Sequence, residues 1–268
     1  MTEFEYCLNT STIRPTPIRE KIRIAGQLGY RAIEPWNDEV DDYLRQGGTI
    51  EDLRKAIDDA GLRVASVIAL FGWTEADPIA HRIALDECKR RMDQAARLGS
   101  PYIVASPPNE VVDLGFAAGR FAELMRIGRE IGVTPSMEFL GFVEGVHTLQ
   151  SARAIADGSG ATVVADVFHL MRGGGSIDDL LTIPGDRMAI FHINDLPASP
   201  PPTMQSDSDR VMLGEGFADL RGVIANLRTI GYRGPLSLEL FNETLWAADP
   251  EEVCRVGLER MRGLVESS

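Results

Sequence analysis

The sequence predicts an α/β fold, a single (β/α)8 TIM barrel that takes up residues 1–268. The main observation is a repeat: seven times, a helical stretch ends in glycine and a short run rich in Val, Ile and Leu follows at once. The second is that amphipathic stretches, with apolar residues at intervals of three and four, separate these runs. Alternating strands and helices pair in parallel through right-handed crossovers, and eight such units fit one barrel.

The expected strands follow in chain order. The first is 4–9, and the others begin after a glycine in LGYRAIE, AGLRVASVIAL, LGSPYIVAS, IGVTPSMEF, GSGATVVAD, IPGDRMAIFHI and IGYRGPLSLEL. Glycine readily adopts the left-handed conformation that ends a helix, and the apolar run then enters the core. The count is therefore eight strands.

The expected helices lie between these strands, at 18–28, 50–60, 79–98, 116–131, 148–156, 220–230 and 251–265. An open doubly wound sheet is the main alternative, but no GxGxxG follows the first strand. One segment, 196–213, breaks the rhythm with PASPPPTMQSDSDR. It is either a lid or pocket wall at the catalytic end of the barrel or a tolerated surface insertion.

Composition excludes several classes of function. The chain has 27 Lys+Arg against 40 Asp+Glu, a formal net charge of −13, which argues against binding to nucleic acid or to an anionic membrane. The N-terminal residues do not resemble a signal peptide and no apolar run could span a bilayer, so we expect a cytoplasmic protein.

The three cysteines form no CxxC pair, so we expect them to be buried thiols. The oligomeric state stays open, with a homodimer as one candidate.

Four polar residues interrupt apolar runs at the ends of consecutive expected strands: Glu138, Asp166, His192 and Glu239. Active sites of such barrels lie at the carboxyl ends of the strands. An ionised side chain in apolar surroundings is disfavoured unless it is paired or bound to metal. A lone case would favour an ordinary buried polar residue, but four in register favour a divalent-metal site with hard and borderline ligands.

Seven more residues lie at or beyond strand ends and are candidates for substrate contacts. Aromatic rings at such a rim can stack on the apolar faces of sugars or cyclitols, and Arg210 in the long loop could reach the acidic ligand set. For each, packing or solvent exposure is the alternative. The seven are Asn9, Glu34, Trp36, Trp73, His169, Arg210 and Trp246.

This ligand set suits a small neutral hydroxyketone. A divalent ion with three carboxylates and a histidine carries a net charge near −1, which disfavours phosphorylated substrates. The ion would act as a Lewis acid and stabilise a cis-enediolate. Glu138 and Glu239 are the expected acid/base pair as well as ligands.

Several motifs resemble the xylose-isomerase-like barrels, a family of sugar isomerases, epimerases and related enzymes: EYCLNTST, AIEPW, AARLGSPYIVASPP, MEFLG, VVADVFH, FHINDLP, SDRVMLGEGFADL and LSLELF. The resemblance implies metal ligands at Glu138, Asp166, His192 and Glu239, with His169 and Arg210 contacting substrate. It implies one divalent metal ion, Zn²⁺, Mn²⁺ or Co²⁺, and isomerisation or epimerisation of a keto-sugar or keto-inositol.

Three alternatives remain at this point. A dehydratase or lyase of the same fold, acting on a keto-sugar or 3-dehydroshikimate, would expel a β-hydroxyl from the same intermediate. A DNA-repair enzyme of the endonuclease IV type would need a trinuclear zinc cluster, and four histidines with this net charge argue against it. A binding protein without catalysis would be favoured if the four ligands did not converge.

Overall fold

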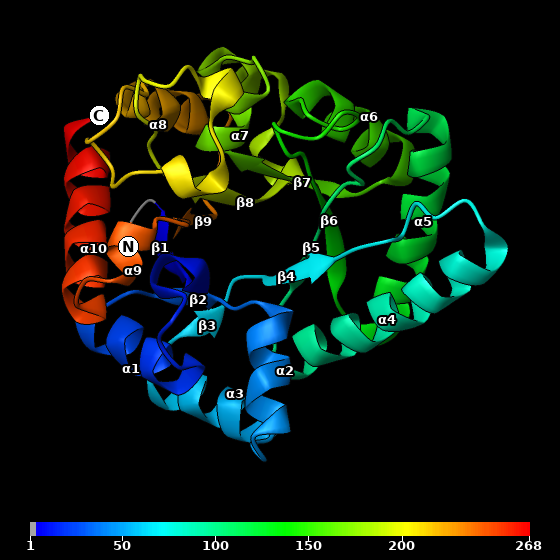
Figure 1. Ribbon diagram of the computed structural model, residues 1–268, viewed down its shortest axis with the longest axis horizontal. Coiled ribbons are helices and arrows are strands. Elements are labelled where there is room, and N and C mark those ends of the chain that lie inside the picture. The colour runs from blue at the N-terminus through cyan, green and yellow to red at the C-terminus, as the bar shows by residue number, and fades with distance from the viewer. Residues whose placement is uncertain (1–3) are drawn as a thin grey trace.

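The strands of the computed structural model, which describes residues 4–268, form one parallel sheet that curls into a nearly closed barrel (Figure 1). Their order in the sheet is β3-β2-β1-β9-β8-β7-β6-β5-β4. The predicted fold class is therefore confirmed. The strands are β1 (Glu5–Asn9), β2 (Ala32–Glu34), β3 (Arg63–Val64), β4 (Val67–Leu70), β5 (Tyr102–Ala105), β6 (Thr134–Glu138), β7 (Thr162–Asp166), β8 (Met188–Ile193) and β9 (Pro235–Leu238).

The third expected strand is divided, which raises the count in the described residues from eight to nine. Its first part, β3, pairs with β2, and its second part, β4, pairs with β5. The break falls at Ala65 and Ser66, where Ser66 donates a side-chain hydrogen bond to the buried Glu34. An isolated parallel bridge between Trp36 and Ile68 spans the gap between the two ends of the sheet.

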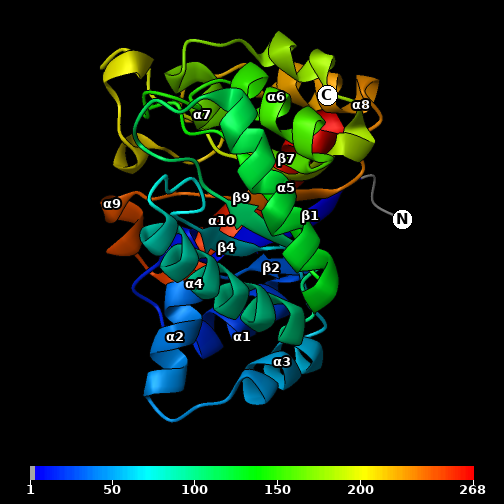
Figure 2. The same cartoon turned by 90° about the vertical axis from the view of Figure 1, so that its right-hand side faces the viewer.

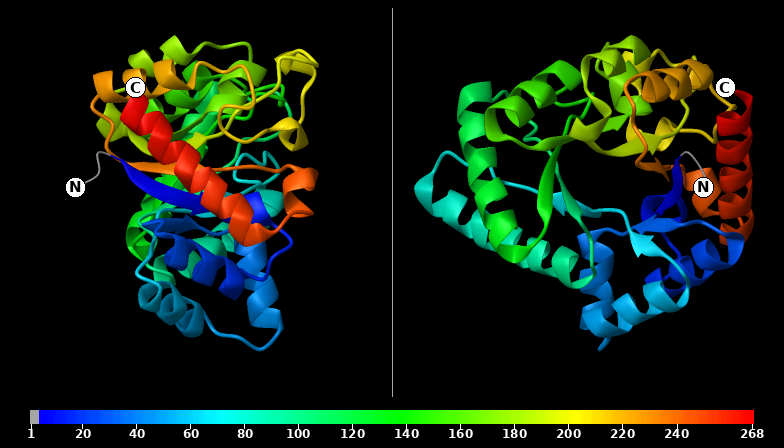
Figure 3. Two further views of the ribbon diagram at one scale, coloured as in Figure 1. Left: turned by 90° about the vertical axis from the view of Figure 1, so that its left-hand side faces the viewer. Right: turned by 180° about the vertical axis from the view of Figure 1, so that it is seen from behind.

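Helices surround the barrel (Figures 1 and 2). All seven expected helices are present, with ends shifted by a few residues, and α10 packs against α1 and α8 so that the last unit adjoins the first (Figure 3). Three short helices, α2, α7 and α9, were not predicted. The helices are α1 (Ile18–Leu28), α2 (Asn37–Arg45), α3 (Ile50–Asp59), α4 (Pro78–Arg97), α5 (Leu114–Ile131), α6 (Leu149–Ser159), α7 (Val167–Arg172), α8 (Leu220–Thr229), α9 (Glu243–Trp246) and α10 (Pro250–Ser267).

The glycines that precede the strands mostly act as expected. Gly29 and Gly132, for example, have φ angles of 91° and 97° and end α1 and α5 in the left-handed conformation. Gly185 differs, because it lies in a 3₁₀ turn and a Cβ there would be 2.4 Å from the backbone nitrogen of Tyr232. Glycine is required at this position because the backbone of the chain at Tyr232 comes too close for a side chain, and not because the residue ends a helix.

The core has two parts. A large cluster fills the layer between the sheet and the helices, and a smaller cluster joins small and β-branched side chains of the barrel strands, such as Ala32, Val104, Val164 and Ile190. The three cysteines are buried free thiols, as expected. None of the helices in the described residues is long and apolar enough to cross a membrane.

Candidate metal centre

Three of the predicted ligands, all carboxylates, surround one ring nitrogen of the fourth, His192. Glu138 ends β6, Asp166 ends β7, His192 is the next-to-last residue of β8, and Glu239 directly follows β9. In the sheet, His192 pairs in register with Asp166 on one side and with Ser237 on the other. Its Nδ1 lies 3.2 Å from Glu239 Oε2, 3.3 Å from Glu138 Oε1 and 3.8 Å from Asp166 Oδ2. The side chains thus come from four neighbouring strands.

The donor set fits one metal ion. One ligand atom each from Asp166, His192 and Glu239 lie within 4.8 Å of one another, and Glu138 adds an oxygen beside the same nitrogen. The Nδ1 of His192 is buried and has no hydrogen-bond partner among the described residues. A buried nitrogen without a partner is costly, and a neutral imidazole nitrogen with carboxylate oxygens is a known ligand set for divalent ions such as Zn²⁺.

Burial and neighbouring charges displace the pKa values of Glu138 and Glu239 in opposite directions. Burial raises the pKa of Glu138 to about 7. Burial acts in the same direction on Glu239, but the positive charges of His192 and Arg210 outweigh it and hold the pKa of Glu239 well below its ordinary value. Burial alone would lower the pKa of His192, yet the carboxylates, Glu239 first, hold that pKa well above its ordinary value. Two carboxyl groups with pKa values displaced in opposite directions suit opposite roles in proton transfer.

Asn194, which sequence reasoning missed, orients Asp166. Its Nδ2 donates to Asp166 Oδ2 at 2.9 Å, and its Oδ1 accepts the backbone N–H of Phe168 at 2.9 Å. Asp166 Oδ1 accepts the backbone N–H of His169, so this residue both ends β7 and caps α7. The signal in the sequence was an asparagine directly after an apolar run, and the structure shows that it is fully buried.

Arg210 reaches the ligand set, as the sequence suggested. Its side chain is 1% exposed, and its Nη1 lies 2.5 Å from Glu239 Oε2 and 3.4 Å from Asp166 Oδ2. The guanidinium carbon lies 4.8 Å from the ring centre of Phe168 and 5.1 Å from that of Phe241. The cation is thus held between two aromatic rings and against two predicted ligands.

The 196–213 segment carries Arg210 to the predicted ligands and is held in place by hydrogen bonds of its own. The buried Gln205 donates to the carbonyls of Pro197 and Pro200, and Arg172 donates to the carbonyl of Gln205. Two 3₁₀ turns, Pro202–Met204 and Asp207–Asp209, lie within it. In Figure 2 this yellow segment and α9 project from the same side of the barrel, opposite the N-terminal end.

His169 lies between a backbone amide and Arg210. Its Nδ1 accepts the N–H of Gly141 at 3.2 Å, and its Nε2 lies 3.1 Å from Arg210 Nη2. Burial and the neighbouring Arg210 hold the pKa of His169 well below its ordinary value, so the ring is neutral. The ring of Phe142, an exposed residue, packs edge-on against it at 5.3 Å. His169 therefore lies next to the ligand set without joining it.

We expect His169→Ala to keep the metal and lose turnover. The substitution removes a neutral imidazole beside Arg210 but none of the atoms around His192 Nδ1, so the rate should fall by about 10²-fold or more. Elemental analysis of the purified variant checks the metal, and a turnover assay checks the rate. Loss of the metal would show instead that His169 is itself a ligand.

The three tryptophans differ in how exposed they are. Trp36 and Trp246 are partly exposed, and their indole N–H groups donate to Asn9 Oδ1 and to the carbonyl of Ser11. Trp73, by contrast, is 1% exposed, its N–H donates to the carbonyl of Ser106, and its ring packs edge-on against a phenylalanine of α5. Trp73 is therefore buried directly after β4, whereas Trp36 and Trp246 keep part of their rings exposed.

Asn9 and Glu34, two further candidates for substrate contacts, have hydrogen-bond partners within the protein. Both are fully buried. Asn9 Nδ2 donates to Glu34 Oε2 at 3.0 Å and to Glu239 Oε1 at 2.9 Å, while its Oδ1 accepts N–H groups from Ser11 and Trp36. A side-chain amide with both protons and its oxygen engaged has no group left for a hydroxyl of a substrate.

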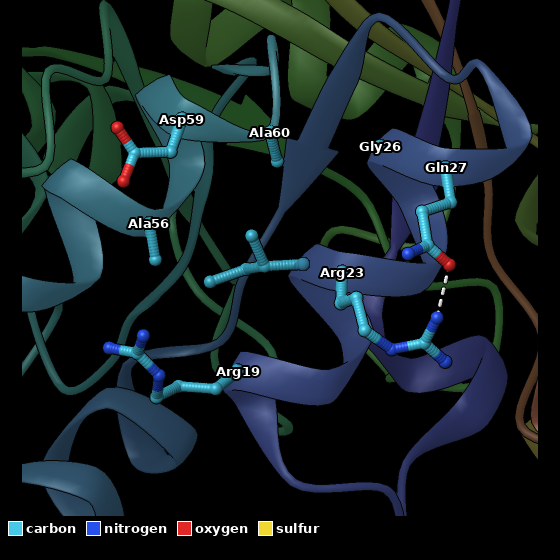
Figure 4. Close-up of a pocket in the computed structure, with 8 residues that line it drawn as sticks. Arg19, Arg23, Gly26, Gln27, Ala56, Asp59 and Ala60 are labelled. Carbon is cyan, nitrogen blue, oxygen red and sulfur yellow. Dashed lines mark hydrogen bonds between the residues drawn. The ribbon is translucent and has the colours of Figure 1, made fainter.

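Two cavities flank different parts of the barrel. One, of about 600 Å³, lies among the loops after β4, β5 and β6, and its lining includes Phe71, Ser106 and Leu140, which is two residues beyond Glu138. Another, of about 450 Å³, lies between α1 and α3 (Figure 4) and is lined by residues such as Arg23 and Gln27, which are hydrogen-bonded to each other. None of the predicted ligands lines this second cavity, so it is separate from the metal centre.

A parallel barrel with three carboxylates and a histidine at the carboxyl ends of four neighbouring strands defines a class of barrels built to hold a metal ion. Residues 22–264 match the family model described as Xylose isomerase-like TIM barrel, and the chain belongs to that family.

Relatives and solved structures agree with this assignment. The inosose isomerase of Bacillus velezensis is 26% identical, covering 97% of this chain and 96% of the relative. The 3-dehydroshikimate dehydratase of Pseudomonas putida is 25% identical over 93% of this chain but only 40% of its own length. The structure of the IOLI protein with a bound zinc atom has a TM-score of 0.91 and 25% identity, covering 98% of this chain and 99% of that one.

Proposed function

We propose that this protein is a divalent-metal-dependent isomerase or epimerase of a small neutral keto-sugar or keto-inositol. The observation that carries the proposal is the convergence of Glu138, Asp166 and Glu239 on the buried Nδ1 of His192, which lacks a hydrogen-bond partner among the described residues. The similarity to inosose isomerases over nearly the full length of both chains supports the substrate class. The bound zinc of the IOLI protein supports Zn²⁺ as the first metal to test.

Glu239 and Glu138 have different proposed roles in proton transfer. A bound divalent ion would polarise a carbonyl and an adjacent hydroxyl, which makes the C–H bond between them more acidic. Glu239, held ionised by His192 and Arg210, is suited to accept that proton. Glu138, with a pKa of about 7, is suited to hold a proton and return it at the neighbouring carbon of the enediolate.

The surroundings favour a neutral substrate. The 600 Å³ cavity at the same end of the barrel has three acidic lining residues, Glu75, Glu110 and Asp113, and none of its lining residues is Lys or Arg. None of the predicted ligands lines this cavity, so its acidic side chains bear on the charge of a molecule that approaches the metal centre rather than on contacts at the metal itself. Apolar side chains such as Phe71 and Val111 line the same cavity and suit the C–H faces of a polyol ring.

A dehydratase of the same fold is the second candidate, supported by the similarity to the P. putida 3-dehydroshikimate dehydratase. Proton removal next to the carbonyl would be the same, but the intermediate would then expel a β-hydroxyl as water. The two candidates share the metal centre and differ in the fate of the intermediate.

Deuterium exchange tests the proposal before any product is known. The protein, loaded in turn with Zn²⁺, Mn²⁺ or Co²⁺, is incubated in deuterium oxide with keto-inositols, ketoses and 3-dehydroshikimate, and deuterium uptake is measured by mass spectrometry. We expect uptake into a keto-inositol or a ketose. Loss of water from 3-dehydroshikimate without such uptake would favour the dehydratase, and no reaction by metal-loaded protein would contradict both.

A further inference from the structure

We infer that Glu34 is a positioning residue of the metal centre, which holds His192 so that Nδ1 is the ligand atom. The inference rests on the proposed metal site. His192 Nε2 lies 3.2 Å from Glu34 Oε1 and 3.1 Å from Glu34 Oε2. Both side chains are 0% exposed, and the two residues are 158 positions apart in the sequence. Only the closed barrel brings them together.

The contact determines which nitrogen is free. A carboxylate accepts hydrogen bonds, so the nitrogen that faces Glu34 carries the proton in the neutral ring, and the lone pair lies on Nδ1. Nδ1 is the atom surrounded by the oxygens of Glu138, Asp166 and Glu239. Metal-binding histidines usually donate their other N–H to a carboxylate or carbonyl, which fixes the ring and makes the ligating nitrogen more basic.

Glu34 is itself held in place by the strands around it. Its Oε1 accepts from Ser66 Oγ and faces His192 Nε2, while its Oε2 accepts from Ser237 Oγ at 2.6 Å and Asn9 Nδ2 at 3.0 Å. Two partners for each oxygen leave the carboxylate little capacity to bind metal or substrate directly. Its role toward the metal is therefore exerted through His192.

Asn9 links this carboxylate to the ligand set. The same Nδ2 donates to Glu34 Oε2 and to Glu239 Oε1, so one amide fixes the positioning carboxylate relative to a predicted ligand. The indole N–H of the partly exposed Trp36 donates to Asn9 Oδ1 and completes the network. Glu34, Asn9 and Trp36, which were candidates for substrate contacts, thus form one hydrogen-bond network beside the metal centre.

Metal affinity tests the inference. We expect Glu34→Gln to raise the dissociation constant for Zn²⁺ by about 10- to 100-fold, measured by competition with a chelator. The matched control is Glu123→Gln, because Glu123 also faces a histidine, His81 Nε2 at 3.0 Å, but outside the metal centre. This control should bind Zn²⁺ like the wild type. Equal affinity in Glu34→Gln and the wild type would overturn the inference.

Two further measurements separate the possible failures. If wild-type protein binds no divalent metal, the proposed function fails, whereas weakened binding confined to Glu34→Gln supports the positioning role. If circular dichroism shows that Glu34→Gln does not fold, the wild type is tested instead. Nitrogen-labelled wild-type protein is loaded with cadmium, and NMR shows which nitrogen of His192 couples to the metal. Coupling of cadmium to His192 Nδ1 with a protonated Nε2 is expected, and coupling to Nε2 would overturn the inference.

Discussion

Glu239→Gln should abolish deuterium exchange from solvent into a keto-inositol or ketose substrate, and Glu138→Gln should abolish deuterium incorporation at the neighbouring carbon of the isomerised product. General acid–base catalysis contributes about 10²–10⁴-fold, and each substitution replaces a proton-transferring carboxyl with an amide that cannot titrate. Each glutamate lies within 3.3 Å of His192 Nδ1, so both are at the metal centre rather than on the outer surface. The measurement is the rate of deuterium uptake at saturating metal.

Two controls make this result interpretable. Since both glutamates are also predicted ligands, the metal content of each variant is measured by elemental analysis, and only metal-loaded protein is assayed. Glu130→Gln is the matched substitution, because Glu130 is exposed on α5 and paired with Arg126; it should leave exchange unchanged. Retained exchange in metal-loaded Glu239→Gln, or retained formation of the deuterated isomerised product by metal-loaded Glu138→Gln, would refute the two-glutamate mechanism.

The clustering of the candidate ligands could be predicted because polar residues at strand ends are conspicuous in sequence. Asp166 and His192 each interrupt an apolar run, and parallel strands bring their carboxyl ends to one edge. Glycines followed by apolar runs located the strands, and periodic apolar residues located the longer helices. Helix α7, with six residues, is too short to show such a period.

The roles of the surrounding residues could not be predicted, because they depend on which atoms are already engaged. Glu34 and Asn9 end strands just as the ligands do, yet their oxygens and protons are used by neighbours from distant parts of the chain. Trp73 follows a strand like the other tryptophans, but its ring turns inward. The position of a residue in the sequence predicts at which end of the barrel it lies. Its hydrogen-bond partners, which the sequence does not show, determine whether its side chain is free to contact substrate or holds another residue in place.

Asp195→Ala should strongly destabilise the segment that carries Arg210. The buried Asp195 carboxylate accepts four backbone N–H groups at 2.9–3.1 Å, from Leu196, Gly214, Gly216 and Ala218. An N–H left without a partner costs about 1–3 kcal/mol, so the loss of four acceptor contacts should lower the free energy of unfolding by more than about 3 kcal/mol. Urea unfolding of the metal-free protein measures the change.

The matched control is Asp219→Ala in the same region. Asp219 caps α8 and accepts one backbone N–H, from Gly222 at 2.9 Å, so its removal should cost only about 0.5–2 kcal/mol. If Asp195→Ala destabilises the protein no more than this control, the segment does not depend on the buried carboxylate. A larger loss would agree with the count of hydrogen bonds that each side chain accepts.

Asp195→Ala should also reduce turnover at temperatures where the variant is still folded. Asp195 pairs through its backbone with Val211, the residue directly after Arg210, so the carboxylate and this pair together fix where the guanidinium enters the site. His192 and Arg210 together hold the pKa of Glu239 low, so displacement of Arg210 would raise that pKa. Glu239 would then stay protonated, and unable to accept a proton from substrate, up to a higher pH. The pH at which the rate rises should therefore move upward in Asp195→Ala and stay unchanged in Asp219→Ala.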